Sequence, residues 1–371
     1  MKRSLVSLLA AGSLLATGAP TQVRACTGIS LTTQDGTVVR ARTLEFGFPV
    51  QSSVLVIPAG QPMSATLPGG GKGMAFETKY SVIGASVLGY HGYLDGVNDQ
   101  GLSAGLFYFP GFAGYAAAQP DDAAKALAPQ DFLAWILGTF ATIDEVRAGL
   151  DDVVLVPTPL PGLGSPAGTV APAHFFVEDR SGKSIVIEPI GGTLRVHDAP
   201  LGVVTNAPPY DWHMTHLRNY LNLTVEDIEQ VRLGDVTLKA LSSGTGLTGL
   251  PGDFTSPSRL VRAAIFAANA EPTATAADAV LQAFHILNQF DLPPGSVKIS
   301  AVGGKPVPEY TEWTSAADLT NRRWYFRTFE DQSIRVVDLE AAVAAAAGKI
   351  AAISMDSKQP VADVSTAIVK D

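Results

Sequence analysis

Cysteine is almost absent from this chain: Cys26 is the only one among 371 residues. A single cysteine cannot form an internal disulfide, and it also excludes a cysteine-rich metal site. Histidine is scarce as well, with six residues whose spacing indicates no Cys–His pairing. After the first 25 residues there is no run of 18 or more apolar residues, so we expect no membrane insertion by the rest of the chain.

Positive charge is also in short supply. Lys and Arg number 26 against 35 Asp and Glu, which gives a formal net charge of −9. An acidic surface repels nucleic acid and anionic membranes, so neither is an expected partner.

The first 25 residues have the pattern of a signal peptide. Lys2 and Arg3 precede an apolar run at residues 5–15, and Val23-Arg24-Ala25 provides small or aliphatic residues where a signal peptidase reads them. Cleavage after Ala25 predicts an exported protein, periplasmic or secreted, whose first residue is Cys26. Removing this leader also makes the net charge more negative, because it carries basic residues and no acid.

An N-terminal Cys26 would carry a thiol and a free α-amine on one carbon. This combination is a nucleophile with its own base, as in enzymes with an N-terminal threonine. Two other interpretations remain open at this point. The cysteine could be an inert buried residue, or it could be the acylated cysteine of a lipid-anchored binding protein, since residues 23–26 loosely resemble a lipobox. Arg24 is large and charged for that motif.

The order of elements predicts an α+β fold with antiparallel sheets rather than alternating βαβ units. Strands are expected at residues 27–33, 37–45, 54–57, 80–88, 101–109, 175–177, 185–188, 193–196, 202–205, 324–328 and 334–337. Helices are expected at residues 129–140, from Thr142 onward with Glu145 completing a capping box, and at 212–221, 257–270 and 276–290. We expect one catalytic domain at 26–345 and a C-terminal tail at 346–371.

Three motifs match known site patterns without their structural context. Residues 244–249 read G-x-G-x-x-G, but Pro251 blocks the helix that a dinucleotide site needs. Ser103 is the serine of a G-x-S-x-G pattern, yet strand residues follow it where a serine esterase needs a helix. His213 and His216 are spaced i, i+3 without the register of a zinc site.

A series of further motifs runs through the chain in a fixed order. These are Cys26-Thr27-Gly28-Ile29, residues 41–46 (ARTLEF), residues 95–102 (DGVNDQGL), residues 204–208 (VTNAP), Asp211-Trp212-His213, residues 249–255 (GLPGDFT) with Ser258-Arg259, and residues 284–288 (FHILN). In this series the chain resembles the choloylglycine hydrolase family, which comprises bile salt hydrolases and penicillin V acylases within the N-terminal nucleophile hydrolase superfamily.

The resemblance implies a fold and a set of site residues. The fold is a four-layer αββα sandwich of two antiparallel sheets flanked by helices. The nucleophile corresponds to Cys26, the arginine beside its thiol to Arg42, and the acid that pairs with the α-amine to Glu45, where many members have aspartate. The oxyanion residues correspond to Asn206 and to the backbone N–H of Tyr108, and a late arginine of the site corresponds to Arg259.

The resemblance also implies hydrolysis of a linear, non-peptide amide through a thioester, with no metal or organic cofactor. The expected partner is a small-molecule acyl amide such as penicillin V or a conjugated bile salt. An N-acyl homoserine lactone is an alternative substrate of the same family. The tyrosine at position 108, where bile salt hydrolases usually have asparagine, favours the penicillin V type. Family members suggest a homotetramer, with residues 209–235 as a candidate assembly segment.

Overall fold

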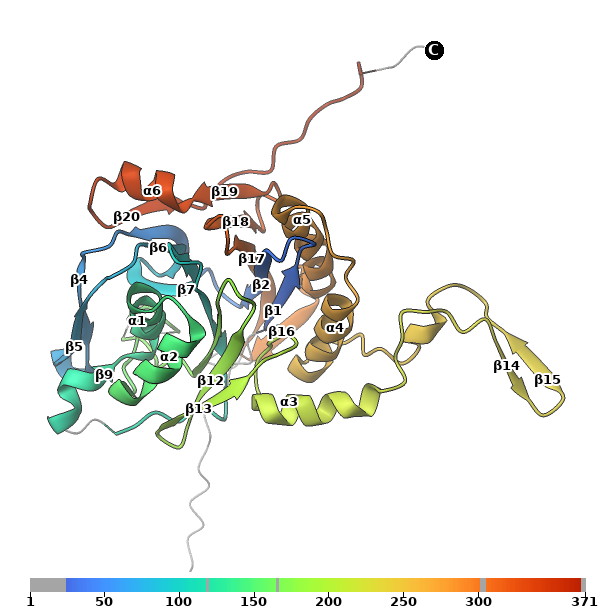
Figure 1. The fold of residues 1–371 in the computed structure, drawn as a ribbon, viewed down its shortest axis with the longest axis horizontal. Coiled ribbons are helices and arrows are strands. Elements are labelled where there is room, and N and C mark those ends of the chain that lie inside the picture. Colours follow the sequence, from blue (N-terminus) through green and yellow to red (C-terminus); the bar gives the residue numbers. More distant parts are fainter. Residues whose placement is uncertain (1–24, 118–119, 165–166, 301–304, 368–371) are drawn as a thin grey trace, which may run out of the picture.

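Two antiparallel β-sheets lie face to face between two layers of helices. The computed structural model describes residues 25–117, 120–164, 167–300 and 305–367. Helices α4 and α5 pack on one sheet, and α1 packs on the other (Figure 1). One hydrophobic cluster fills the space between the sheets, and a second lies between the first sheet and α4 and α5. The predicted αββα architecture is therefore confirmed.

The first sheet contains the strand on which the chain begins. Its strand order is β1-β2-β17-β18-β19, and β16 pairs with residues 306–309 at the N-terminal end of β17. The strands are β1 (Cys26–Thr32), β2 (Val38–Phe46), β16 (Val297–Ser300), β17 (Pro306–Asp318), β18 (Arg323–Thr328) and β19 (Arg335–Asp338). The central strand β17 was not predicted from the sequence.

The second sheet has eight strands in the order β13-β12-β11-β8-β7-β6-β3-β20. They are β3 (Ser53–Ile57), β6 (Val82–Val87), β7 (Tyr90–Asn98), β8 (Ser103–Tyr108), β11 (Ala173–Glu178), β12 (Ser184–Ile190), β13 (Thr193–Asp198) and β20 (Ala351–Ser354). Three two-stranded pairs lie outside both sheets: β4 (Pro62–Thr66) with β5 (Lys72–Glu77), β9 (Ala126–Leu127) with β10 (Val154–Leu155), and β14 (Gln230–Leu233) with β15 (Val236–Lys239).

The helices are α1 (Phe132–Thr139), α2 (Ile143–Gly149), α3 (Tyr210–Leu217), α4 (Ser256–Ala268), α5 (Ala276–Leu287) and α6 (Leu339–Ala346). Half of the capping box predicted for α2 is present. The Thr142 side chain accepts the Glu145 N–H, while the Glu145 side chain accepts the N–H of Ala141 rather than that of Thr142. No helix in the described part of the chain has the length and apolar character needed to cross a membrane.

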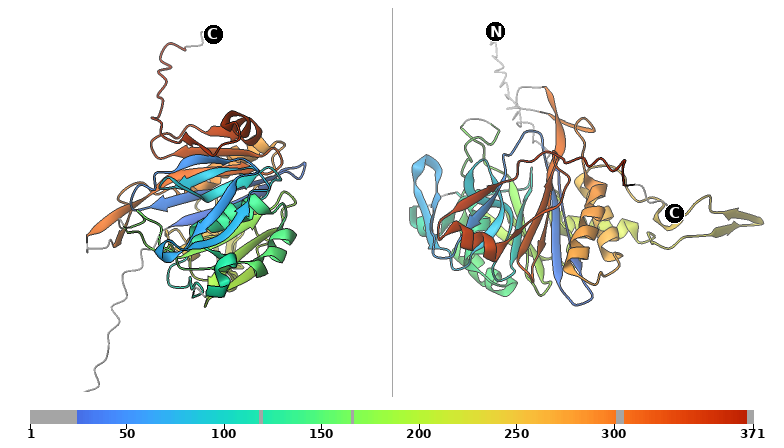
Figure 2. Two further views of the ribbon diagram at one scale, coloured as in Figure 1. Left: turned by 90° about the vertical axis from the view of Figure 1, so that its left-hand side faces the viewer. Right: turned by 90° about the horizontal axis from the view of Figure 1, so that it is seen from above.

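Further segments differ from the sequence expectation. No strand was predicted at β4, β5, β7 or β16, and of the strand expected at 202–205 only Val204 forms a bridge, with Gly28. Part of the expected tail forms β20, which pairs with β3 and completes the edge of the eight-stranded sheet. Its sequence, Ala-Ala-Ile-Ser, is too short and too weakly patterned to be recognised as a strand. The β14–β15 hairpin projects away from the sandwich as an arm (Figures 1 and 2), and every residue of the two strands is exposed.

Candidate active site

Cys26 opens strand β1 and points between the two sheets. It pairs with Leu44 of β2, and both side chains belong to the cluster that fills the inter-sheet space. Only 1% of Cys26 is exposed. Ala25 precedes Cys26 in this structure, so the Cys26 nitrogen is a peptide amide that carries one hydrogen. Cleavage after Ala25 would make it a free amine.

A single bridge brings Asn206 to this residue. Gly28 of β1 and Val204 exchange both backbone hydrogen bonds, at 2.8 and 3.0 Å. Because the bridge is antiparallel, Cys26, two residues before Gly28, lies opposite Asn206, two residues after Val204. The Cys26 N–H accordingly donates to Asn206 Oδ1 at 2.8 Å.

Arg42 lies on the same face of β2 as Leu44 and enters a gap in the second sheet. The ladder between β7 and β8 ends at the Asp95–Gly105 pair. Immediately beyond it, Arg42 Nη1 donates to the carbonyl oxygens of Leu94, at 2.9 Å, and Leu106, at 2.6 Å. These carbonyls fix the guanidinium, while its Nη2 has no partner among the described residues.

Aromatic rings complete the surroundings of Arg42. Its guanidinium carbon lies 4.3 Å from the centroid of the Phe107 ring and 5.4 Å from that of Trp313. Gly28 allows this arrangement, since a Cβ at that position would lie 2.9 Å from the Phe107 ring. The charge on Arg42 is therefore held in a rigid, dry environment, and the NH₂ group at Nη2 is still available.

Glu45 lies on the opposite face of β2, which faces the helices. Its backbone N–H donates to the Ala25 carbonyl at 3.0 Å, and its Oε1 accepts from Thr311 Oγ1 at 3.2 Å. Burial raises the pKa of Glu45 to about 8, although the positive charge of Arg259 opposes the shift. The second oxygen, Oε2, has no partner among the described residues.

Arg259 of α4 links these groups. Its Nη2 donates to Asn206 Oδ1 at 2.7 Å, and its Nη1 donates to the Cys26 carbonyl and, at 2.9 Å, to Thr27 Oγ1. Residue 27 faces the helices because side chains alternate along a strand. Arg259 therefore holds the backbone of β1 from the helix side while the Cys26 thiol points to the other side.

Tyr108 ends strand β8 beside Asn206. Asn206 Nδ2 donates to the Tyr108 carbonyl at 2.8 Å. The neighbouring Phe109 N–H bonds to Pro172, so the pair formed by Tyr108 and Ala173 is the non-hydrogen-bonded kind. The N–H and C=O of Tyr108 therefore both point away from β11, toward the side on which Asn206 lies.

The charges around the Cys26 thiol act in opposite directions. Burial raises its pKa, and the positive charge of Arg42 is the largest effect that lowers it. Glu45 raises it further, and Arg259 lowers it. An ammonium group at the Cys26 nitrogen would add another positive charge close to the sulfur and favour the thiolate.

All six site residues expected from the resemblance therefore meet around Cys26. The structure adds residues that sequence reasoning missed. Glu309 of β17 is buried and accepts the Ala25 N–H at 2.9 Å. The Nε2 of His213 lies 2.9 Å from the Asn206 carbonyl. The presence of His213 in the Asp-Trp-His motif was a signal, but its role could not be read from spacing.

His213 is a neutral support for Asn206. Burial lowers its pKa to about 4, so the ring is uncharged at neutral pH and donates through Nε2 to the Asn206 carbonyl. The Asn206 N–H donates to Ser256 Oγ at 3.0 Å. Backbone and side chain of Asn206 are thus both held in place.

The G-x-G-x-x-G, G-x-S-x-G and His213/His216 motifs do not form catalytic or metal sites among the described residues. Ser103 lies within β8, where its hydroxyl donates to the Gly96 carbonyl and accepts from Arg40. Residues 244–249 form a loop with one short 3₁₀ turn at Thr245–Leu247. His216 is half-buried and stacks on Trp212, away from His213. Among the described residues there is no group of three or more His, Cys, Asp or Glu that could hold a metal ion.

Two hollows lie near these residues. A narrow cavity of about 30 Å³ reaches the Cys26 thiol, and its walls are mainly apolar, including Leu44, Phe46, Leu106 and Leu160. Its apolar walls suit a hydrophobic group next to the sulfur, but a volume of about 30 Å³ holds little more than a water molecule, so an acyl group enters only if the walls move apart.

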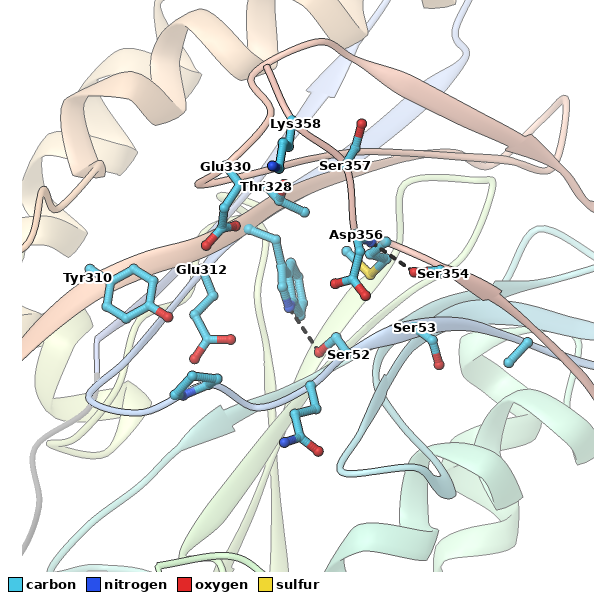
Figure 3. Close-up of a pocket in the computed structure, with 15 residues that line it drawn as sticks. Ser52, Ser53, Tyr310, Glu312, Thr328, Glu330, Ser354, Asp356, Ser357 and Lys358 are labelled. Atoms are coloured by element: carbon cyan, nitrogen blue, oxygen red, sulfur yellow. Dashed lines mark hydrogen bonds between the residues drawn. The ribbon is translucent and has the colours of Figure 1, made fainter. Parts of the chain in front are cut away.

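The wider hollow is a cleft of about 990 Å³ that Cys26 does not line. Figure 3 shows Glu312, Glu330 and Asp356 around it. Trp313 lies between this cleft and Arg42, since its indole N–H donates to Ser52 Oγ at 3.1 Å on the cleft side. The cleft is therefore separate from the site at Cys26.

Comparisons with known proteins identify related sequences and structures. The family model for linear amide C–N hydrolases, choloylglycine hydrolase family, matches residues 26–354. A bile salt hydrolase/transferase of Clostridium perfringens is 32% identical over 317 residues, which cover 85% of this chain and 92% of that protein. A penicillin V acylase of Pectobacterium atrosepticum is 24% identical over 81% of this chain and 77% of its own length.

A solved structure has the same fold. The conjugated bile acid hydrolase of Clostridium perfringens superposes with a TM-score of 0.79 at 28% identity, covering 91% of this chain and 99% of that one. With the family match over nearly all of the chain after Ala25, these similarities show that the protein belongs to the choloylglycine hydrolase family of linear amide C–N hydrolases.

Proposed function

We propose that the protein is an exported amidohydrolase whose nucleophile is the thiol of an N-terminal Cys26. The observation that carries this proposal is a pair of buried, unpartnered polar atoms near Cys26, one on a guanidinium group and one on a carboxyl group. Arg42 Nη2 and Glu45 Oε2 are both buried without a partner among the described residues. A thiolate and an ammonium group are the two species that would satisfy them, and an N-terminal cysteine supplies both.

Proton exchange within Cys26 activates the sulfur. A free α-amine has a pKa of about 7.7–8.0 and a thiol one of about 8.5, so the transfer between them is nearly balanced. Arg42 favours the thiolate, while Glu45 and the Asn206 side-chain oxygen orient the ammonium.

Acylation then follows in balanced steps. The thiolate attacks the carbonyl carbon of the substrate amide, and the oxyanion is stabilised by Asn206 Nδ2 and the Tyr108 N–H. The C–N bond breaks as the Cys26 ammonium delivers its proton to the departing nitrogen. A thioester remains on Cys26.

Deacylation uses the same amine as a base. Water gives one proton to the α-amine while its oxygen attacks the thioester carbonyl, and the thiolate leaves. The products are a carboxylic acid and the amine released in the first step. Every proton transfer in this cycle takes place at the Cys26 nitrogen.

Removal of residues 1–25 is the step that creates this nitrogen. The leader pattern supports cleavage after Ala25 and export to the periplasm or the medium. A lipid-anchored form is disfavoured physically, because a diacylglyceryl group on a sulfur that is 1% exposed would have to enter the inter-sheet core.

The substrate class follows from the cavity beside the thiol. Its apolar walls suit a hydrophobic acyl group, such as the side chain of penicillin V, a conjugated bile acid or an N-acyl homoserine lactone. The first two correspond to the names of two relatives, a penicillin V acylase and a bile salt hydrolase/transferase.

We also propose a homo-oligomer, by resemblance a tetramer, assembled through the β14–β15 arm. The arm exposes Leu233, Val236 and Leu238, which are 60%, 59% and 51% accessible. Apolar residues on a projecting hairpin are typical of a surface that another copy covers. Replacing Leu233 and Leu238 by Glu should yield monomers in light scattering, and an unchanged mass would refute this assembly.

The proposed activity is tested by parallel hydrolysis assays on the secreted protein. Penicillin V, glycine- and taurine-conjugated bile acids and N-acyl homoserine lactones are each incubated with wild type and with Cys26→Ala. Amine release from at least one substrate by wild type alone is the expected result. Equal hydrolysis by Cys26→Ala would overturn the proposal.

A further inference from the structure

A carboxamide lies in the wall of the cavity at Cys26. Gln130 lines this cavity together with Cys26, Leu44 and Leu163, and only 6% of the residue is exposed. Its Oε1 is buried and has no hydrogen-bond partner among the described residues. A strongly polar group therefore faces a cavity whose walls are otherwise mainly hydrocarbon and aromatic.

The backbone fixes Gln130 at this position. It belongs to the 3₁₀ turn Pro129–Asp131 that leads into α1. The turn approaches β7 closely at Gly92, where an added Cβ would lie 2.4 Å from the Gln130 carbonyl oxygen. The next residue, Asp131, accepts a hydrogen bond from the Tyr90 hydroxyl. Gln130 is thus held on a rigid turn next to the site.

A buried amide oxygen without a partner is unfavourable, so most such groups in native proteins are paired with protein atoms or with ordered water. The described protein atoms around Gln130 do not provide that partner. Under the proposed function, the acyl part of the substrate enters this cavity and can provide it.

We propose that Gln130 is a specificity residue that recognises an oxygen atom within the acyl group of the substrate. A carboxamide both donates and accepts, so it pairs with an ether, hydroxyl or keto oxygen after rotation of its terminal bond. The substrates favoured by this chain are then acyl amides with an oxygenated acyl chain rather than a plain hydrocarbon chain. This inference rests on the proposed function at Cys26.

The discrimination has a physical basis. An acyl group with a methylene in place of the oxygen would fill the same volume but leave the buried carboxamide unpaired. Sites built around a buried polar group reject an analogue that lacks the matching atom more strongly than apolar sites reject a change of size.

The test uses the processed enzyme and two isosteric substrates, the phenoxyacetyl and 3-phenylpropanoyl amides of one amine, which differ by oxygen against methylene. The quantity compared is kcat/KM for the phenoxyacetyl amide divided by kcat/KM for the 3-phenylpropanoyl amide. It is measured in wild type and in Gln130→Met, which keeps the shape of the side chain. Because the ether oxygen also activates the carbonyl, the change in this ratio between enzymes is informative, rather than the ratio itself.

We expect the ratio to fall about tenfold in Gln130→Met, the size of one lost buried hydrogen bond. Leu163→Met, in another part of the same wall, should leave the ratio unchanged. Thermal unfolding checks that the variants fold, and Gln130→Leu serves as a second variant.

Equal ratios in wild type and both Gln130 variants would overturn the specificity role while leaving the hydrolase activity intact. If the wild type cleaves neither of the two amides and none of the substrates of the parallel assays, the proposed function is overturned and this inference with it.

Discussion

The side-chain oxygen of Asn206 accepts the backbone N–H of Cys26 at 2.8 Å. Asn206 is itself held by Arg259 at Oδ1, by Tyr108 at Nδ2 and by His213 at its carbonyl. One residue thus positions both the nitrogen that moves protons and the amide hydrogen that stabilises an oxyanion. It is the structural centre of the proposed mechanism.

Asn206→Ala should lower kcat by about 10²–10³-fold, which is the usual cost of losing one oxyanion donor. KM should change little, because the acyl group is bound by the apolar cavity. Steady-state kinetics on an amide substrate give both values. Leu160→Ala, in the cavity wall, is the contrasting variant and should raise KM. A rise in KM with constant kcat for Asn206→Ala would contradict the assigned role.

Arg42→Met should shift the pH dependence of Cys26 alkylation to higher pH. The positive charge of Arg42 is the largest effect that lowers the pKa of this thiol, so its removal leaves the effect of burial less opposed. The rate of reaction with iodoacetamide, followed against pH, measures the shift. Arg147→Met on the surface helix α2 is the control, and an identical profile for both variants would refute the role of Arg42.

Glu45 makes the stability of the uncleaved chain depend on pH. Its pKa is raised from 4.5 to about 8, so the folded state keeps a proton that the unfolded state has lost between these values. Stability should therefore fall as pH rises from about 4.5 to 8 in a Cys26→Ala chain that retains Ala25. Adding Glu45→Gln should make this fall shallower, and the buried Glu178, whose pKa is also raised to about 8, should retain the rest of it.

Thermal unfolding at several pH values measures the effect. Glu340 is exposed on α6, and Glu340→Gln should leave the pH dependence as it is. An unchanged slope in the Glu45→Gln chain would show that this carboxyl group is not protonated in the folded state.

Ser103→Ala should retain amidase activity. Within a buried strand, the Ser103 hydroxyl bonds to Gly96 and Arg40, and both contacts are structural. Its removal should lower the free energy of unfolding by about 1 kcal/mol, as for a typical hydrogen bond. Chemical denaturation and an activity assay check both values, and loss of activity in a folded Ser103→Ala protein would favour a serine esterase.

Much of the fold and site was predictable because the informative residues form local patterns. Alternating strands and the N-cap at Thr142 are encoded within a few residues. The six site residues came from the resemblance, and the structure brings them together through the β1–β2 register and the Gly28–Val204 bridge.

What the sequence did not reveal depends on long-range contacts. Strand β17 begins with Pro306 and Pro308 and contains a register shift between Thr311 and Trp313, so it lacks a clean alternating pattern. Its residues Glu309 and Thr311 were therefore missed as neighbours of Ala25 and Glu45. His213 was considered only as a metal ligand, because its contact with Asn206 arises from the path of α3.

Mass spectrometry of the acyl-enzyme tests the central claim most directly. The active protein is mixed with an acyl amide, quenched in acid and digested. The account predicts an N-terminal peptide that begins at Cys26, with an unmodified α-amine and the acyl group on sulfur. A fully active preparation whose peptide still contains Ala25, or whose acyl group is on another residue, would contradict it.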